Sequence, residues 1–317
     1  MFHSILYPDK ERHDEPRYAE APDYFRDLNL DRMLQSITKG RGEFHLEQFF
    51  WTPLKDVESV QYRQEVMKDL ENKEILDRFI KDKVDGIAIS CIESNLVTPS
   101  INQAVAVGIP VITWDSDAPQ SKRTAFYGLD DYEAGVKMGE EVVRLLGQGG
   151  GEVAALTTGG ADNLQKRING FLSVIRNHPI KLVEAFDVQD DASTAVKVVA
   201  SATRNYPNLK AWISVGGWPA FNADITAPLD PARTYMITFD TIPAAWDMIK
   251  SGRIHMALGQ KYFGWGSVPT RLLYDIVANG KSPDSPFVNS GVDVVTKENI
   301  EEYIQKWKQM EAGQAVE

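Results

Sequence analysis

The sequence contains one cysteine, Cys91, among 317 residues. A lone cysteine excludes an intrachain disulfide. Because Cys91 follows the apolar run GIAIS, we expect a buried, unreactive thiol and not a nucleophile. The five histidines are scattered, and no group of cysteines and histidines has the spacing of a zinc site. We therefore expect neither a metal nor a cofactor.

Motifs of catalysis are also missing. GxSxG, HExxH and GxGxxG do not occur. The GKS at 280–282 is not a Walker A loop, because the position of the required first glycine is Asp275 and the segment follows a helical stretch. We therefore expect a protein that is not an enzyme. One alternative stays open, because a carboxylate pair such as Asp115 and Asp240 can do acid–base chemistry.

The amino terminus, MFHSILYPDKERHDEPRY, lacks the basic region and the apolar core of a signal peptide. No apolar run is long enough to span a membrane. These features alone predict a cytoplasmic chain without membrane insertion. The net charge of −11 and the pI of about 5.1 disfavour general attraction to nucleic acid or to an anionic membrane.

The composition and the pattern of apolar residues change near Val84. Residues 1–83 are rich in charge and aromatics, and their best helix spans Val57–Lys83, where apolar residues recur at near-helical spacing. No convincing buried strand occurs there. After Val84, short apolar strands alternate with helices, which predicts βαβ units in parallel sheets covered on both faces.

The predicted strands are GIAIS (86–90), PVITW (110–114), EVAALT (152–157), KLVEAF (181–186), KAWISV (210–215), TYMITF (234–239) and HMALG (255–259). The predicted helices are Leu96–Val107, Tyr132–Leu146, Leu164–Asn177, Ala192–Asn205, Pro243–Ser251 and Gly266–Ala278.

Two carboxylates close predicted strands, Asp115 in TWDSD and Asp240 in TFDT. In open α/β sheets, ligands bind at the carboxyl ends of the strands. A carboxylate there can accept two hydrogen bonds from neighbouring hydroxyl groups, and a sugar carries such neighbouring hydroxyls. Each residue taken alone fits a helix N-cap better. The two together, with the groups below, favour a ligand site.

Four further residues are candidates for that site. Arg167 lies in the first turns of a predicted helix, where its fork can reach a polyol or a carboxylate; the alternative is a solvated arginine. Asn163 fits a ligand donor and a helix N-cap equally well. Trp218 follows two glycines and can stack on a sugar, or it can be a core residue. Gln260 ends a strand and suits a neutral polyol, or it is a surface loop residue.

From about Asp77 onward, the chain resembles the type I periplasmic sugar-binding family, the ribose-binding-like receptors of ABC importers. The linked motifs are FIKDKVDGIAIS, INQAVAVGIPVITWDSDAP, FYGLDDYEAG, GGEVAAL, QKRINGF, ITFD, ALGQ and SGVDVVTKENIEEY. The resemblance implies two doubly wound lobes with three hinge crossings, a sugar ligand, ABC permease partners and an extracytoplasmic location. By motif, its ligand positions fall on Ser90, Asp115, Ser116, Arg167, Asp240 and Gln260.

This sequence departs from the ribose receptors at three places. Ser116 stands where those receptors have arginine, and Gly216 stands where they have asparagine. An aromatic residue of theirs is replaced near Asp191. The departures argue against ribose itself, and WDSD also resembles receptors for other sugars and for the autoinducer-2 furanose.

Residues 1–76 resemble the amino-terminal segment of MutS-like mismatch-repair ATPases, which predicts a chimera with a mainly helical first segment. The predicted first lobe is 77–127 with 260–288, and the second lobe is 128–259 with 289–317. The first lobe is then truncated, because the family's first strand, helix and second strand should precede Val84. We expect weakened sugar binding. The alternative function is a DNA-repair-related fragment that acts through residues 1–76.

Overall fold

The computed structural model describes residues 73–91, 94–159 and 161–314, and this part of the chain forms two compact units. Unit 1 holds residues 73–128, Tyr262–Asn289 and 306–314. Unit 2 holds Leu129–Lys261 and Ser290–Gln305. The chain passes between the units after Gly128, Lys261, Asn289 and Gln305, which is one crossing more than the resemblance implies.

The additional crossing lies within the last helix, α13 (Ile300–Glu311). All of 289–317 is predicted to belong to the second lobe, whereas residues from Lys306 onward fall in unit 1. Aromatic packing explains the difference. The Trp307 ring lies 5.8 Å from the ring of Tyr262 and 5.2 Å from that of Phe263, measured between centroids, and both partners belong to unit 1.

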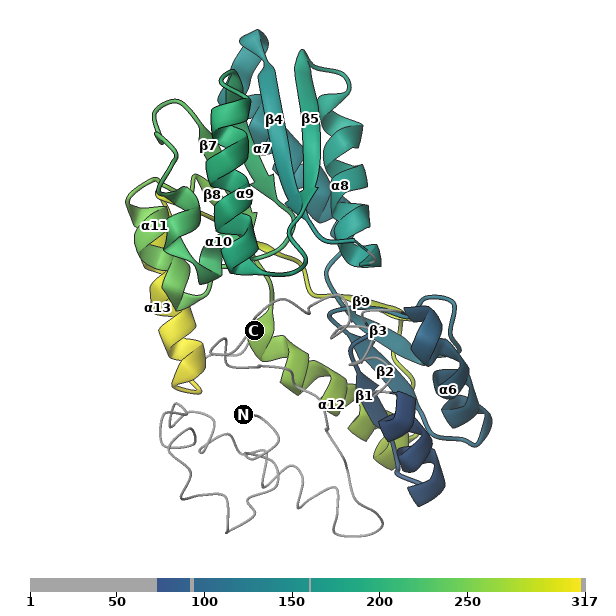
Figure 1. The fold of residues 1–317 in the computed structure, drawn as a ribbon. Coiled ribbons are helices and arrows are strands. Elements are labelled where there is room, and N and C mark those ends of the chain that lie inside the picture. The colour runs from purple at the N-terminus through teal and green to yellow at the C-terminus, as the bar shows by residue number, and fades with distance from the viewer. Residues whose placement is uncertain (1–72, 92–93, 160, 315–317) are drawn as a thin grey trace. The chain divides into compact units, whose positions relative to one another are not determined.

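Unit 1 contains a four-stranded parallel sheet (Figure 1). Its strands, in spatial order, are β1 (Ile87–Ile89), β2 (Val111–Trp114), β3 (Ala125–Gly128) and β9 (Phe287–Asn289). Its helices include α6 (Ser94–Ala106) and α12 (Tyr262–Asn279). β9 joins the sheet from a distant part of the chain, and neither β3 nor β9 was among the predicted strands.

The alternation of side chains along β1 and β2 builds two apolar layers, one on each face of the sheet. Ile87, Ile89 and Val111 pack with α6. Ala88 and Ile112, which point the other way, pack with Leu273 and its neighbours on α12. The prediction of a parallel sheet covered on both faces is therefore confirmed for this unit.

A helix over residues 73–82 leads into unit 1. Leu76 is fully buried, and with Phe79 it packs against Val84 and Ile87 in the same core cluster. The helix that contains the predicted junction, the boundary at Leu76 between the MutS-like segment and the sugar-binding part, is therefore part of the core of unit 1. Residues 57–72 of the predicted helix, and residues 1–72 of the MutS-like segment, lie outside the described residues. In the described part of the chain, β1 pairs with β2 alone, and the loss of the family's first strand stays a prediction.

Unit 2 contains a six-stranded sheet that is parallel except for its last strand, β10. In spatial order its strands are β10 (Asp293–Thr296), β8 (Met256–Gly259), β7 (Tyr235–Phe239), β6 (Leu209–Ser214), β4 (Gly151–Thr157) and β5 (Ile180–Asp187). Its helices besides α13 are α7 (Asp131–Leu146), α8 (Asp162–Ile175), α9 (Ala192–Asn205), α10 (Trp218–Phe221) and α11 (Trp246–Lys250), with 3₁₀ turns at Gly147–Gly149, Ala223–Thr226 and Pro243–Ala245. The strand order reverses between β4 and β6, and ligands bind at such a reversal in open α/β sheets.

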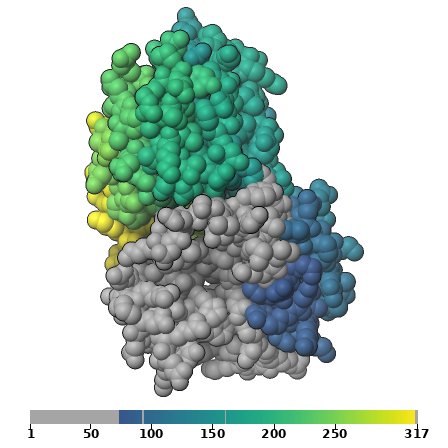
Figure 2. All heavy atoms as spheres, in the orientation of Figure 1, coloured from purple at the N-terminus to yellow at the C-terminus, as the bar shows by residue number. Residues whose placement is uncertain are grey.

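Helices cover both faces of this sheet. Figure 1 shows α9 in front of the strands and α7 behind them, and Figure 2 shows the teal and green side chains of unit 2 as a continuous surface on the visible face. α7 and α8 pack unusually closely. A Cβ on Gly135 would lie 2.0 Å from the backbone oxygen of Arg167, and one on Gly170 would lie 2.0 Å from that of Tyr132. This contact fixes the backbone that carries Arg167.

Within the ranges that the structure describes, no helix is long and apolar enough to cross a bilayer. The same residues contain no group of three or more His, Cys, Asp or Glu placed to hold a metal ion. Cys91 is 1% exposed and belongs to the core cluster of unit 1, so the prediction of a buried thiol is confirmed.

Candidate functional site

Arg167 forms the centre of the candidate site in unit 2. It lies in the second turn of α8 and is 3% exposed, so the alternative of a solvated arginine is wrong. Its Nε donates to Asp131 Oδ1 at 2.9 Å, and its Nη1 donates to the backbone oxygen of Val215 at 2.7 Å. Its Cζ lies 3.8 Å from the centroid of the Phe239 ring. These contacts hold the guanidinium in one orientation at the carboxyl ends of β6 and β7.

Asp131 is the partner that sequence analysis missed. It lies in the first turn of α7, and its side chain is 8% exposed. Burial raises the pKa of the Asp131 carboxyl, and the charge of Arg167 opposes that rise. The preceding Asp130 caps α7, because its side chain accepts from Glu133 N at 3.0 Å. The signal in the sequence was a pair of aspartates directly after FYGL, of which one caps the helix and the other pairs with the arginine.

Asp240 and Gln260 form a hydrogen-bonded pair at the ends of β7 and β8. Gln260 Nε2 donates to Asp240 Oδ1 at 3.0 Å, and Gln260 is 8% exposed, so the surface-loop alternative is wrong. Asp240 has φ of 72° and caps no helix; the same holds for Asp115, with φ of 59°. The cap alternative fails because each residue turns the chain out of its strand in the left-handed region.

Two glycines make room for this arrangement. A Cβ on Gly217 would lie 1.9 Å from Asp240 Oδ2, and one on Gly216 would lie 2.9 Å from the Trp218 indole. Trp218 itself is 4% exposed and opens α10. Its Nε1 donates to Oδ1 of Asp190 at 2.9 Å, a partner that sequence analysis did not name.

Asn163 lies within α8 and not at its N-cap. The N-cap of α8 is Ala161, and Asn163 is the second residue of the helix, so the cap alternative is wrong. Its Oδ1 accepts from the backbone N–H of Leu164 at 2.9 Å. Asn163 therefore lies one turn before Arg167 on the same helix.

The candidate residues of unit 1 lie at the carboxyl ends of two adjacent parallel strands, β1 and β2. Ser90 and Ser116 are buried, and Asp115 is half-buried. Cys91 N donates to the backbone oxygen of Ser116 at 2.9 Å, and Asp115 N donates to the backbone oxygen of Tyr127 at 3.0 Å. Three predicted residues from two strands thus meet at one edge of this sheet.

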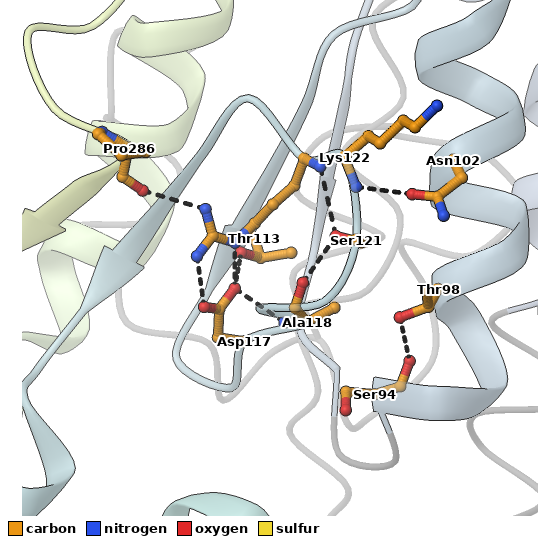
Figure 3. A network of polar contacts seen from close by, with 10 residues as sticks. Ser94, Thr98, Asn102, Thr113, Asp117, Ala118, Ser121, Lys122 and Pro286 are labelled. Carbon is orange, nitrogen blue, oxygen red and sulfur yellow. Dashed lines mark hydrogen bonds and ion pairs between the residues drawn. The ribbon is translucent and has the colours of Figure 1, made fainter.

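A network around Asp117 holds the loop that follows (Figure 3). Asp117 Oδ1 accepts from Thr113 Oγ1 at 2.6 Å and from Ala118 N at 2.8 Å. Arg123 donates through Nε to Asp117 Oδ1 and through Nη2 to Oδ2, the latter at 2.6 Å. Nη1 of Arg123 also donates to the backbone oxygen of Pro286 at 3.1 Å. The loop carrying Asp115 and Ser116 is therefore tied to β2 and to the segment that enters β9.

Both edges have the features of the carboxyl-end ligand site of an α/β sheet. Residues 59–282, more than half of the chain, match the family described as periplasmic binding protein domain. The chain belongs to this family. The match begins inside the segment that sequence analysis assigned to a MutS-like protein, and it does not extend to residues 1–58, for which that assignment stays a prediction.

Similar proteins include several sugar-binding proteins. The D-allose-binding periplasmic protein of Escherichia coli is 26% identical over 234 residues, which are 70% of this chain and 72% of that protein. The xylose/arabinose-binding protein XylF of Sulfolobus acidocaldarius is 22% identical over 247 residues, which are 72% of this chain. This chain spans 61% of the length of the Sulfolobus protein.

One solved structure extends this similarity. An ABC transporter solute-binding protein from Burkholderia graminis, solved in complex with D-arabinose, is 32% identical, with a TM-score of 0.68. The similarity covers 73% of this chain and 82% of that one. The predicted family and the fold class of periplasmic-binding-protein-like α/β units are confirmed.

Proposed function

We propose that this chain is the sugar-binding component of an ABC-type importer, and that its ligand is a monosaccharide or polyol. The observation that carries the proposal is the arrangement in unit 2. Arg167 is buried and stacked on Phe239, beside the hydrogen-bonded pair of Asp240 and Gln260. The names of the similar proteins support a sugar as the ligand.

The chemistry of these groups suits a neutral polyol. Two guanidinium N–H donors of Arg167 bond to Asp131 and Val215, and the others of its five are left for ligand oxygens. Asp131 also balances the charge of Arg167, so the edge has little affinity for an anion. Asp240 and Asp115 offer carboxylate oxygens that accept from adjacent hydroxyls. Gln260 both donates and accepts.

The remaining candidates supply further contacts. Ser90 and Ser116 are hydroxyls at the unit 1 edge, and Asn163 is an amide one turn before Arg167. Trp218, which opens α10 directly after Gly217, supplies an aromatic face that can stack on a sugar. In this proposal the chain is not an enzyme and needs no cofactor. Its partners are the sugar and the permease subunits of the importer, outside the cytoplasm, and it takes no nucleic acid.

The test is thermal unfolding of the purified chain with a panel of sugars that includes D-arabinose, D-xylose, D-ribose and D-allose. A ligand that binds only the folded state stabilises it by about 2.7 kcal/mol when the free ligand is about 100 times Kd. We expect Tm to rise with one or more sugars, and the rise to be lost in Asp240→Ala. Asp224→Ala, an exposed carboxylate in a 3₁₀ turn of unit 2, is the matched control and should keep the response.

The proposal fails if a chain that unfolds cooperatively shows no Tm change with any sugar. It also fails if Asp240→Ala and Asp224→Ala respond alike. A response much weaker than that of a complete receptor would agree with the predicted truncation of the first lobe.

A further inference from the structure

Unit 2 carries a surface groove that the candidate sugar site does not use. The groove has a volume of about 490 Å³ and lies where α8 packs beside β5 (Figure 1). α7 adds Tyr132 to its lining, and β5 adds residues 180–182. On α8 the lining side chains recur at helical spacing and share one face. They are Asn169, Leu172, Ser173 and Arg176.

The groove exposes apolar side chains. Tyr132 is 47% exposed and Leu172 is 37% exposed. Ile175 and Ile180, which also line the groove, are buried and form its floor. Exposed apolar side chains that gather at one place among polar groups are typical of a surface that another protein covers.

The charged side chains of the groove are both basic. Arg176 and Lys181 are exposed, and within the described residues neither side chain has a hydrogen bond or an ion pair. The described lining includes no carboxylate, although the chain as a whole has a net charge of −11. The first carboxylate of β5, that of Glu184, accepts from the Tyr206 hydroxyl at 2.7 Å. The groove is therefore a local reversal of the charge of the chain.

The end of α8 does not account for the arginine. Arg176 is the C-cap of this helix, a place where arginine can bind the free carbonyls of the last turn. Backbone N–H groups already take these carbonyls. Asn177 N donates to the backbone oxygen of Val174 at 3.3 Å. His178 N donates to that of Ile175 at 2.9 Å. The guanidinium is therefore left for a group from outside the chain.

We propose that this groove, the α8–β5 groove, binds an acidic peptide segment of a partner protein. Carboxylates of the segment pair with Arg176 and Lys181, and an apolar side chain of the segment covers Leu172 and Tyr132. Tyrosine and arginine are among the residue types that contribute most to binding at protein interfaces. Small-molecule sites bury most of their ligand, whereas the basic and apolar walls of this groove are open to solvent. The inference goes beyond the proposed function and does not depend on sugar binding.

The experiment measures binding of the purified full chain to immobilised mixtures of synthetic peptides about eight residues long. An extended segment of this length spans about 26 Å, more than the stretch of about 10 Å from Asn169 to Arg176 along α8. The acidic mixture alternates glutamate with leucine, isoleucine, valine or phenylalanine. A second mixture has lysine in place of glutamate, and a third has serine in place of the apolar residues. We expect the acidic mixture to bind, the serine mixture to bind more weakly, and the lysine mixture not to bind.

Two sets of variants locate the binding. The double variant Arg176→Gln with Lys181→Gln should lose affinity for the acidic mixture by a factor of about ten. Leu172→Ser should also weaken binding, because it removes apolar contact area. The matched control is Lys197→Gln with Arg204→Gln on α9. Both of these residues are exposed, Arg204 lies in the last turn of its helix, and the same two charge types are removed. The control should keep wild-type affinity.

The outcomes decide the inference without reference to sugar. It is overturned if the acidic mixture does not bind, or if the lysine mixture binds equally well. Equal losses in the groove variant and in the α9 control also overturn it, because net charge would then explain the binding. A serine mixture that binds as well as the acidic mixture would show attraction of simple anions only and would overturn docking of a peptide segment. The groove variants should keep the Tm response to sugar, so this inference and the proposed function fail separately.

Discussion

The two candidate edges use the same residue types but are held in different ways. In each unit an aspartate with positive φ follows a strand directly, Asp115 in unit 1 and Asp240 in unit 2. In unit 2 the carboxylate–guanidinium pair of Asp131 and Arg167 lies within the site, with side chains 8% and 3% exposed. In unit 1 the corresponding pair, Asp117 with Arg123, lies in the loop beyond the strand end.

This difference indicates different roles for the two pairs. Arg167 is oriented by Asp131, Val215 and Phe239 before any ligand arrives, so unit 2 presents a preformed donor. The pair in unit 1 orients a loop, and its effect on a ligand passes through Asp115. Preformed groups lose less entropy on binding. We therefore expect unit 2 to contribute more to sugar affinity.

The largest expected effect comes from breaking the buried pair. Asp131→Ala leaves Arg167 as an unpaired charge at 3% exposure and should lower the free energy of unfolding by about 3–5 kcal/mol. Denaturant unfolding measures this loss. Glu133→Ala in the same turn is the control, because its contact with Lys137 at 3.8 Å lies on the surface. Equal stability of the two variants would contradict the assignment of Asp131 as the partner of Arg167.

The core of unit 1 at the predicted junction is tested by Leu76→Ala. Leu76 is fully buried in a cluster with Phe79 and Ile87, so the variant should lose about 2–5 kcal/mol. Lys73→Ala on the same helix removes an ion pair with Asp77 whose partners are 44% and 43% exposed. That control should cost about 0.2–1 kcal/mol at most. A Leu76→Ala variant as stable as Lys73→Ala would show that the helix does not belong to unit 1.

The loop network of unit 1 should matter less for stability than the buried pair of unit 2. Asp117→Ala removes the acceptor for Arg123, Thr113 and Ala118 and should cost about 1–3 kcal/mol. Under the proposed function it should also weaken sugar binding, because Asp115 lies two residues away. Stability and affinity are measured on the same preparation. A loss of affinity larger than that in Asp240→Ala would reverse the comparison between the units.

The smallest expected effect is a pH dependence confined to unit 2. Burial lowers the pKa of His255 below its ordinary value of 6.5. Its Nδ1 accepts from Met236 N at 3.2 Å, and its Nε2 donates to the backbone oxygen of Pro231 at 3.1 Å, which is the neutral tautomer. The unfolded chain therefore takes up the proton first as the pH falls. The contribution to stability is complete above 6.5 and is lost as the pH falls through the folded pKa.

This effect is measured by unfolding the wild type and His255→Gln at a series of pH values between about 7.5 and about 5. The series extends about one unit or more to either side of the ordinary pKa of histidine. The described part of unit 1 contains no histidine, so its unfolding should not share this dependence. A variant with the same pH profile as the wild type would contradict the role of His255.

The apolar runs of the sequence were sufficient to predict β1, β2, β4, β5, β6, β7 and β8, but not β3, although its four residues are buried. They were not sufficient for β9, whose exposed residues are ordered only by pairing with β3, or for β10, whose partner β8 comes from more than 30 residues earlier. Strand ends identified Asp115, Asp240 and Gln260 as candidates, and the start of a predicted helix identified Arg167, but the sequence did not identify Asp131 as the partner of Arg167.

The sequence by itself determined the family, the alternation of strands and helices, and which polar residues follow the strands. The family followed from the resemblance of linked motifs, and the strands and helices followed from hydrophobic periodicity, which is a local property of the chain. Only the tertiary structure decided that Arg167 pairs with Asp131, that Trp218 holds Asp190, and that Gly216 and Gly217 make room for an indole and a carboxylate. Arg167 and Asp131, 36 residues apart in the chain, meet because α8 packs closely against α7, whereas Trp218 and Asp190, 28 residues apart, follow the carboxyl ends of two parallel strands of one sheet, β6 and β5. No local sequence pattern predicts these contacts between distant residues.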